Sequence, residues 1–117
     1  MYEIWKIEKK FWTAGLTAMH RHVSPEALII PPTPMPPLYF KDLLNKAVRA
    51  RPFAAIELTE KNFISADKTA IITYLACAKH PRYKNPYYAR CSTAYVNQLG
   101  VYKIIAHTHR KLSKADL

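Results

Sequence analysis

Four residues in the second half of the chain carry side chains that could bind a transition metal. They are Cys77, Cys91, His107 and His109, and thiolates and imidazoles suit zinc or copper. The two cysteines lack the close spacing that is typical of a zinc site, and two cysteines do not make a disulfide scaffold. We therefore interpret the group as a packed histidine beside two reduced thiols, and we predict no metal and no cofactor.

Carboxylates that could act as a general base are scarce in the same region. No Asp or Glu lies between Asp67 and Asp116. Asp42 and Glu57 are the acids that we expect to be able to face inward, and Asp42 lies just inside a helix start, where it stabilises the helix dipole. An isomerase or epoxide hydrolase that relies on an Asp or Glu base is therefore not supported, since such a base must reach the proton that it removes.

A small-molecule pocket is the preferred interpretation of the aromatic and hydroxyl side chains. An apolar cleft with a few polar groups is the usual form of such a site. The residues that we predict to line it are Trp12, Met19, Tyr39, Tyr74, Tyr88, Arg90, Ser92 and Thr108.

Arg90 is the most specific member of this predicted pocket. An inward arginine with no acid nearby in the sequence indicates an anionic ligand such as a carboxylate. An arginine at the open rim of the sheet, reaching water, is the alternative, and the sequence leaves both open.

The charge of the chain is strongly positive but dispersed. The 117 residues carry a net charge of +10, which attracts anions of any kind. The run from Arg82 to Tyr88 mixes aromatic and basic residues that could stack on bases, but no nucleic-acid motif accompanies it. We therefore rank nucleic-acid binding third among the possible functions and do not expect a nucleic-acid partner.

Length and hydropathy indicate one domain over residues 1–117. No apolar run reaches the length of about 18 residues that a membrane span needs, and the first ten residues lack the apolar segment of a signal peptide. These features predict no membrane partner and a cytoplasmic location.

The elements that must position these residues follow from hydrophobic periodicity and turn residues. Helices are predicted over 3–14, over a short segment that carries Leu16, Met19 and Val23 and stops at Ser24-Pro25, and over 38–51. Strands are predicted over 27–30 and 53–64, with the proline-rich segment 31–37 as a stiff connector. Three long antiparallel strands complete the chain, over 69–79, 87–96 and 101–109.

The hairpin turns allow the strand register to be predicted. They place Cys77 opposite Cys91, and Cys91 opposite His107, unless a bulge intervenes. Alternation then assigns Tyr74, Tyr88, Arg90, Ser92 and Thr108 to the face that covers the core. The other face is half-apolar, and such a face on a small sheet usually contacts a partner subunit. We predict a homodimer through Thr73, Leu75, Cys77, Cys91, Thr93, Tyr95, Ile105 and His107.

Three segments carry a resemblance that covers essentially the whole chain. Residues 87–96 and 102–107 resemble the penultimate and closing strands of the nuclear transport factor two-like superfamily, also called SnoaL-like or cystatin-like. Residues 3–12 are similar to its opening helix. The small bacterial members of undefined function are the most similar in pattern, although Tyr102 stands where the family usually has Trp, and Thr108-His109 where glutamines are common.

The resemblance implies an α+β fold, in which a strongly curved antiparallel sheet wraps around three N-terminal helical segments to form a cone with a central cavity. Members of the superfamily include isomerases, dehydratases and pure binding domains, so the fold does not give the function. We predict a homodimeric domain of undefined physiological role that binds a small apolar molecule, either neutral or anionic, in the cavity of the sheet. An isomerase or dehydratase that uses Tyr or His in the cavity is one alternative, and an interaction module without a ligand is another.

Overall fold

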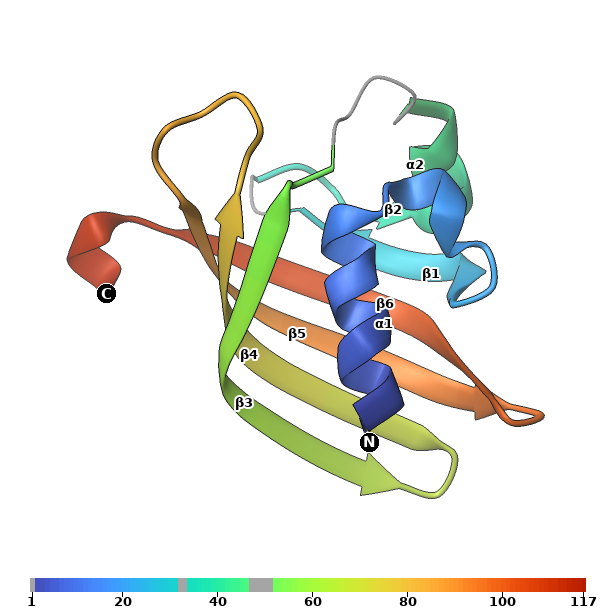
Figure 1. The fold of residues 1–117 in the computed structure, drawn as a ribbon. Coiled ribbons are helices and arrows are strands. Elements are labelled where there is room, and N and C mark those ends of the chain that lie inside the picture. The colour runs from blue at the N-terminus through green and yellow to red at the C-terminus, as the bar shows by residue number, and fades with distance from the viewer. Residues whose placement is uncertain (1, 32–33, 47–51) are drawn as a thin grey trace.

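The computed structural model describes residues 2–31, 34–46 and 52–117 (Figure 1). Its elements, in chain order, are α1 (Tyr2–Thr13), a 3-10 helix (Leu16–Met19), β1 (Val23–Ile30), β2 (Leu38–Tyr39), α2 (Phe40–Lys46), β3 (Ala55–Ala66), β4 (Thr69–Lys79), β5 (Tyr87–Gln98), β6 (Val101–Leu112) and a second 3-10 helix (Lys114–Asp116). The predicted α+β class is confirmed.

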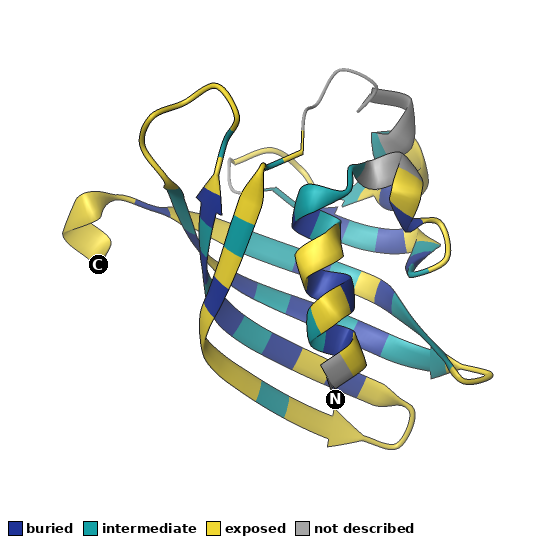
Figure 2. Ribbon diagram, in the orientation of Figure 1, coloured by how far each residue is buried: buried dark blue, intermediate teal, exposed yellow. Residues whose placement is uncertain are grey.

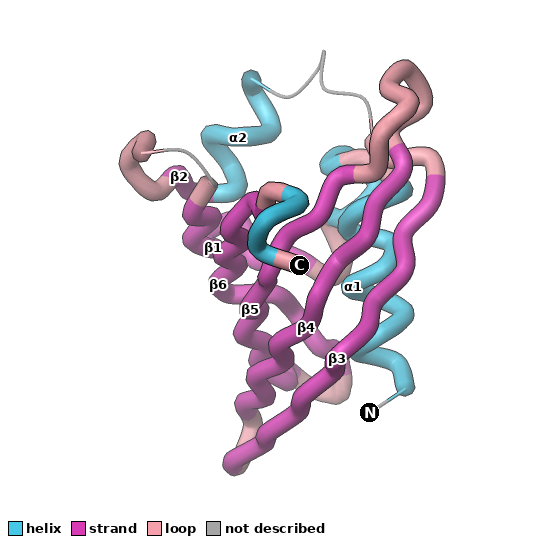
Figure 3. The backbone as a smooth tube through the Cα atoms, turned by 90° about the vertical axis from the view of Figure 1, so that its left-hand side faces the viewer, coloured by secondary structure: helices cyan, strands magenta, loops and turns pink. Residues whose placement is uncertain are grey.

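The strands form one mixed sheet in the order β2-β1-β6-β5-β4-β3. All neighbouring pairs are antiparallel except β1 and β6, which run parallel. The sheet is strongly curved, and α1 lies along its inner face (Figures 1 and 3). The loop between β4 and β5 extends beyond the end of the sheet (Figure 1).

Helix α1 contacts the sheet with a narrow stripe of side chains. Ile4, Ile7 and Trp12 recur at spacings of three to five residues and are buried, whereas Lys9 and Lys10 are exposed. This spacing places the apolar residues on one face of a helix. The helix is followed by Gly15, whose φ of 82° suits a residue without a Cβ.

The core lies between α1 and the inner face of the sheet. Buried and more exposed residues alternate along β4 and β5, as the blue and lighter bands in Figure 2 show. The largest side chains with essentially no exposed surface include Tyr74, Tyr95, Phe40, Ile4, Met19, Ile72 and Ile104.

The N-terminal half differs from the prediction in its local elements. The second helix is only the 3-10 turn Leu16–Met19, and Ser24-Pro25 lies inside β1. The pairing of β1 with β6 shifts between Val23 and Leu28, so Pro25 sits at an irregularity where no ladder donor is needed. The predicted helix over 38–51 is β2 followed by α2, and its last residues, 47–51, lie outside the described residues, as do residues 32–33 of the proline-rich connector.

The predicted strand register is wrong, and the error reverses one strand. Cys91 pairs with Tyr74 and not with Cys77, whose partner is Tyr88. This shift by three residues turns every side chain of β5 to the opposite face, because side chains alternate along a strand. On the other side Cys91 pairs with His109 and not with His107.

A β-bulge in β6 completes the correction. Ala94 pairs with Ala106, but Tyr95 pairs with Ile104, so Ile105 is the extra residue. As a result Ile104 and His107 both face the core, although they are three positions apart. Cys91, Thr93, Tyr95 and His107, which we predicted on the partner face, are buried on the inner face. Thr73, Leu75 and Cys77 remain on the outer face, where they were predicted.

Within the described part of the chain, none of the helices combines the length and the apolar character required to cross a bilayer.

Candidate functional site

Glu8 is a wholly buried carboxylate at the centre of the core. It lies on α1 with 0% of its surface exposed. Tyr95 donates a hydrogen bond to Oε1 at 2.6 Å, and Thr93 donates one to Oε2 at 2.6 Å. The hydroxyl of Tyr74 also donates to Oε2. Trp12 Nε1 donates in turn to the Tyr74 hydroxyl at 2.9 Å. Glu8 and Trp12, which both belong to α1, therefore both bind to the hydroxyl of Tyr74.

The position of Glu8 follows from helix geometry. It is four residues after Ile4 and four before Trp12, and residues at this spacing share one face of a helix. Glu8 therefore interrupts the apolar stripe that covers the sheet. The three hydroxyl groups reach Glu8 because Tyr74 on β4, and Thr93 and Tyr95 on β5, all face inward in the observed strand register.

The environment of Glu8 keeps the carboxylate ionised. Burial alone raises the pKa of this carboxyl group, because it penalises the charged form. Hydrogen bonding to His107, the charge that this imidazole carries when it is protonated, and the Thr93 and Tyr74 hydroxyls together outweigh burial and leave the pKa of Glu8 lowered. His107 Nδ1 lies 3.5 Å from Glu8 Oε2.

A chain of side chains leads from Glu8 toward the surface. Thr93 Oγ1 lies 2.7 Å from His107 Nδ1, and His107 Nε2 lies 3.3 Å from His109 Nδ1. His109 Nε2 then lies 3.0 Å from the Tyr87 hydroxyl. His107 is buried, whereas His109 and Tyr87 are half-buried. The chain thus connects the most buried charge of the described core to a tyrosine at the edge of the protein.

The outer members of this chain are held neutral at ordinary pH. Burial, followed by the charge that His107 carries when it is protonated, lowers the pKa of His109 to about 4. Burial, with a smaller contribution from Cys91, raises the pKa of Tyr87 to about 12. A neutral imidazole has one donor and one acceptor nitrogen, so His109 can pass a hydrogen bond along the chain.

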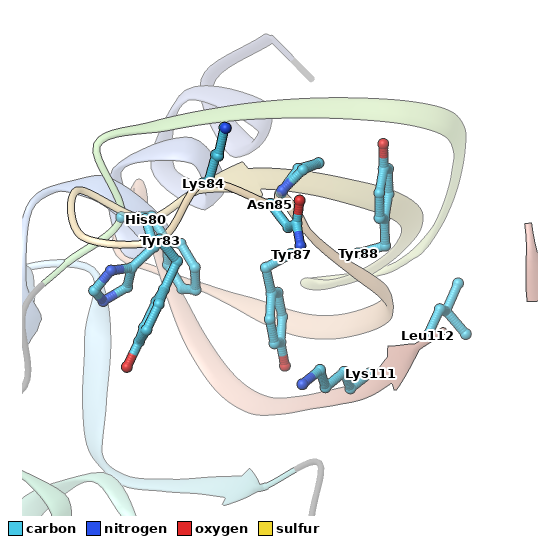
Figure 4. A pocket seen from close by; sticks show the side chains of 10 residues that line it. His80, Tyr83, Lys84, Asn85, Tyr87, Tyr88, Lys111 and Leu112 are labelled. Carbon is cyan, nitrogen blue, oxygen red and sulfur yellow. The ribbon is translucent and has the colours of Figure 1, made fainter. Parts of the chain in front are cut away.

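A pocket of about 650 Å³ opens where Tyr87 ends this chain. It lies beside the β4–β5 loop, and Figure 4 shows Lys84 and Lys111 on either side of Tyr87 in that view. Lys111 Nζ lies 5.7 Å from the centre of the Tyr87 ring. The centres of the Phe53 and Tyr87 rings are 5.4 Å apart. The ten residues that line the pocket are Phe53, His80, Tyr83, Lys84, Asn85, Pro86, Tyr87, Tyr88, Lys111 and Leu112.

The eight predicted ligand residues do not line one cavity. Trp12, Met19 and Tyr74 are buried on the inner side, whereas Tyr39 is 48% exposed on β2. The register shift and the bulge place the other four on the outer face, which corrects their predicted inward orientation: Tyr88, Arg90, Ser92 and Thr108.

Four of the eight predicted ligand residues line hollows that the structure does show. Tyr74, Arg90 and Ser92 contribute to a smaller hollow of about 170 Å³, and Tyr88 lines the pocket beside the β4–β5 loop. Ligand binding by these residues stays a prediction.

Arg90 has an acidic partner that the sequence did not indicate. Its Nη2 lies 3.3 Å from Glu60 Oε1, and both side chains are about half exposed. Glu60 comes from β3, thirty positions away, at a register shift where its φ is 50°. No acid lies near Arg90 in the sequence, and the acid that pairs with it is supplied by a strand that is distant in sequence.

The acids that we expected inside the protein are also placed differently. Asp42 and Glu57 are exposed, while Glu8 occupies the core. A signal for Glu8 was present in the sequence, since it lies between Ile4 and Trp12 on the apolar stripe. Among the described residues no three His, Cys, Asp or Glu side chains gather closely enough to hold a metal ion, and Cys77 faces away from Cys91.

Comparisons with known proteins identify the fold. No family model and no curated protein matches the sequence. A structure described as a "putative ketosteroid isomerase" from Parabacteroides distasonis has a TM-score of 0.80 and 14% identity, over 97% of this chain and 88% of that one. An NTF2-like protein of unknown function from Prochlorococcus has a TM-score of 0.77 and 15% identity, over 98% and 95%.

A third structure, a "putative" calcium/calmodulin-dependent kinase II association domain from Exiguobacterium sibiricum, has a TM-score of 0.75 and 13% identity, over 96% of this chain and 90% of that one. Structural similarity at identities this low indicates a shared fold and does not indicate a shared activity. With the curved six-stranded sheet and its covering helix, these likenesses show that the chain has the nuclear transport factor two-like fold.

Proposed function

We propose that this protein binds a small aromatic anion in the pocket beside the β4–β5 loop. The observation that carries the proposal is the composition of the pocket wall. Phe53, Tyr83 and Tyr87 supply aromatic surface, and Lys84 and Lys111 supply positive charge. None of the ten described lining residues has a carboxylate. The volume of about 650 Å³ falls in the usual range of about 300–1,000 Å³ for ligand pockets.

The charge around the pocket favours an anion at two ranges. The net charge of +10 attracts anions over a distance. At close range, an ammonium group donates charge-assisted hydrogen bonds to a carboxylate, which are stronger than neutral ones. Both lysines are exposed, so salt screens them and we expect binding to weaken as ionic strength rises.

Binding can be tested with a matched pair of probes. Titrating 2-naphthoate and its uncharged analogue 2-naphthamide, followed by amide chemical shifts, locates the site and isolates the effect of charge. We expect naphthoate to shift residues 80–88 and 111–112 and to bind more tightly than naphthamide. The double variant Lys84→Gln/Lys111→Gln should remove that preference. Lys68→Gln, which changes a lysine in the β3–β4 turn, is the control. Equal binding of the two probes by the wild type would contradict the proposal.

A binding role is favoured over an isomerase that uses a carboxylate base. Glu8 has no exposed surface and already accepts three hydroxyl hydrogen bonds. A base must come within hydrogen-bond reach of the proton that it removes, and Glu8 does not reach the pocket wall.

We also propose that two copies of the chain associate through the outer face of the sheet. The register aligns Ile64, Ile71, Ala94 and Ala106 in one row across four strands. Ile64 is 67% exposed and Ile71 is 47% exposed, and Ile105 at the bulge is exposed beside the row. A contiguous apolar patch is typical of an association surface. One structurally similar protein carries the name of an association domain, which supports this proposal.

Light scattering after size exclusion tests the association. We expect a dimer for the wild type and a monomer for Ile71→Lys, because a charge in the row must lose its hydration on association. Leu99→Lys is the matched control, since Leu99 is fully exposed at the tip of the β5–β6 hairpin and is not part of the row. A wild-type monomer at micromolar concentration would contradict the proposal. A cytoplasmic location stays a prediction.

A further inference from the structure

The hydrogen-bond chain from Glu8 to Tyr87 has a direction that can be worked out from its donors. Thr93 has a single hydroxyl proton, and it donates that proton to Glu8 Oε2. The Thr93 oxygen can then only accept from His107 Nδ1, which lies 2.7 Å away. His107 therefore carries a proton on Nδ1. What remains open is the proton on Nε2, and this proton decides the direction of the outer two bonds.

Two arrangements satisfy every member of the chain. When His107 is neutral, its Nε2 accepts from His109 Nδ1–H, and His109 Nε2 accepts from the Tyr87 hydroxyl. When His107 carries a second proton, its Nε2–H donates to His109 Nδ1, and His109 Nε2–H donates to the Tyr87 oxygen. In the first arrangement the Tyr87 proton is used inside the protein. In the second it is free to donate outward.

We propose that the chain is a proton-coupled switch, in which one added proton on His107 reverses the outer hydrogen bonds and makes Tyr87 a donor to an anionic oxygen in the pocket. This inference rests on the proposed binding function and adds a mechanism of recognition to it. Tyr87 is the contact to the ligand, and His107 and His109 are positioning residues. The ligand class is narrowed to aromatic molecules with a carboxylate or a phenolate oxygen.

The groups around the chain favour this distribution of charge. Glu8 Oε2 lies 3.5 Å from His107 Nδ1, so the carboxylate attracts a positive charge at this imidazole. The lowered pKa of His109 keeps that imidazole neutral and able to change tautomer. The titratable or charged side chains that face the chain are Glu8 from α1, Tyr74 from β4, Cys91 from β5 and Lys111 from β6.

A bound anion acts on the chain in two ways. It accepts the Tyr87 proton, which the protonated chain alone can offer. It also offsets the charge of Lys111, which lies 5.7 Å from the Tyr87 ring and repels a proton on the chain. Both effects favour the protonated chain, so binding takes up a proton. By linkage, affinity is then greatest at low pH and falls about tenfold per pH unit where the free chain is neutral.

Calorimetry and NMR test the switch together. Titrating 2-naphthoate in two buffers of different ionisation enthalpy counts the protons taken up, and we expect about one per ligand in the range where the free chain is neutral. Long-range imidazole ¹H–¹⁵N spectra report the tautomer, and we expect His109 to move its proton from Nδ1 to Nε2 on binding. A purely structural histidine would not change tautomer.

Tyr87→Phe separates the switch from the pocket. We expect this variant to bind naphthoate more weakly and without proton uptake. The control Tyr102→Phe, near the start of β6 and outside the pocket lining, should keep the uptake. Binding by the wild type with no proton uptake would overturn the switch and leave the binding proposal intact. If naphthoate does not bind at all, the binding proposal fails. The switch is then decided by an acid titration of the free protein, in which a fixed His109 tautomer would overturn it.

Discussion

The buried carboxylate of Glu8 makes a quantitative prediction about stability. Replacing it with leucine removes the acceptor of three hydroxyl donors from Tyr74, Thr93 and Tyr95. A buried donor left without a partner costs about 1–3 kcal/mol, so the three together cost about 3–9 kcal/mol. Removing a buried charge returns part of this cost. We therefore expect Glu8→Leu to lower the free energy of unfolding by about 3–5 kcal/mol, the range found when one partner of a buried ion pair is lost.

Glu8→Gln should cost much less. A glutamine oxygen at the Oε2 position still accepts from Tyr74 and Thr93, and its amide can donate to Tyr95, whose hydroxyl lies 3.4 Å from the carbonyl oxygen of Ile4. What is lost is the strengthening of hydrogen bonds by charge. Charged hydrogen bonds contribute about 1.5–3 kcal/mol and neutral ones about 0.5–1.5 kcal/mol, so the expected loss is about 1–2 kcal/mol.

Urea unfolding followed by far-UV circular dichroism measures both variants against the wild type. Glu3→Gln, an exposed acid on the same helix, is the control and should change stability by less than about 1 kcal/mol. The result that would refute the reasoning is a leucine variant as stable as the wild type, or more stable than the glutamine variant. Either outcome would mean that the three hydroxyls find other acceptors and that Glu8 does not organise the core.

Three further predictions follow from single residues. Stability should fall with acid in two ranges. Folding favours neutral His109, so the stability from this residue is lost as pH falls from about 6.5 through about 4. Folding also favours ionised Glu8, so the stability from this carboxylate is lost as pH falls below 4.5. Chemical unfolding at several pH values measures both losses, and a free energy of unfolding that does not change with pH would contradict them. Arg90→Ala should change stability by less than about 1 kcal/mol in chemical denaturation, because its ion pair with Glu60 is half exposed, and a larger loss would show that the pair matters. Gly100→Ala should lower stability by about 1 kcal/mol, because its φ is 87° although the space around it is open, and an unchanged melting curve would show that the turn adapts.

The sequence by itself determined the features that depend on neighbouring residues. The spacing of Ile4, Ile7 and Trp12 predicted α1, and the β-branched and aromatic runs predicted β4, β5 and β6. The orientation of β4 was also predicted correctly, with Ile72 and Tyr74 facing the core. These features follow from the periods of a helix and a strand, which a short segment carries on its own.

The tertiary structure alone decided which face of the sheet each side chain of β5 occupies and which side chains contact each other. The length of the β4–β5 loop and the bulge at Ile105 set the register, and a loop sequence does not determine how many residues it takes out of the strands. Arg90 moved to the outer face for this reason, and its partner Glu60 is near it only because β3 and β5 flank the same strand. Glu8 could be read from the apolar stripe as a buried acid, but its partners could not. Thr93, His107 and His109 form a chain from it only once β5 and β6 are in register, since a hydrogen-bond chain depends on distances that no local pattern specifies.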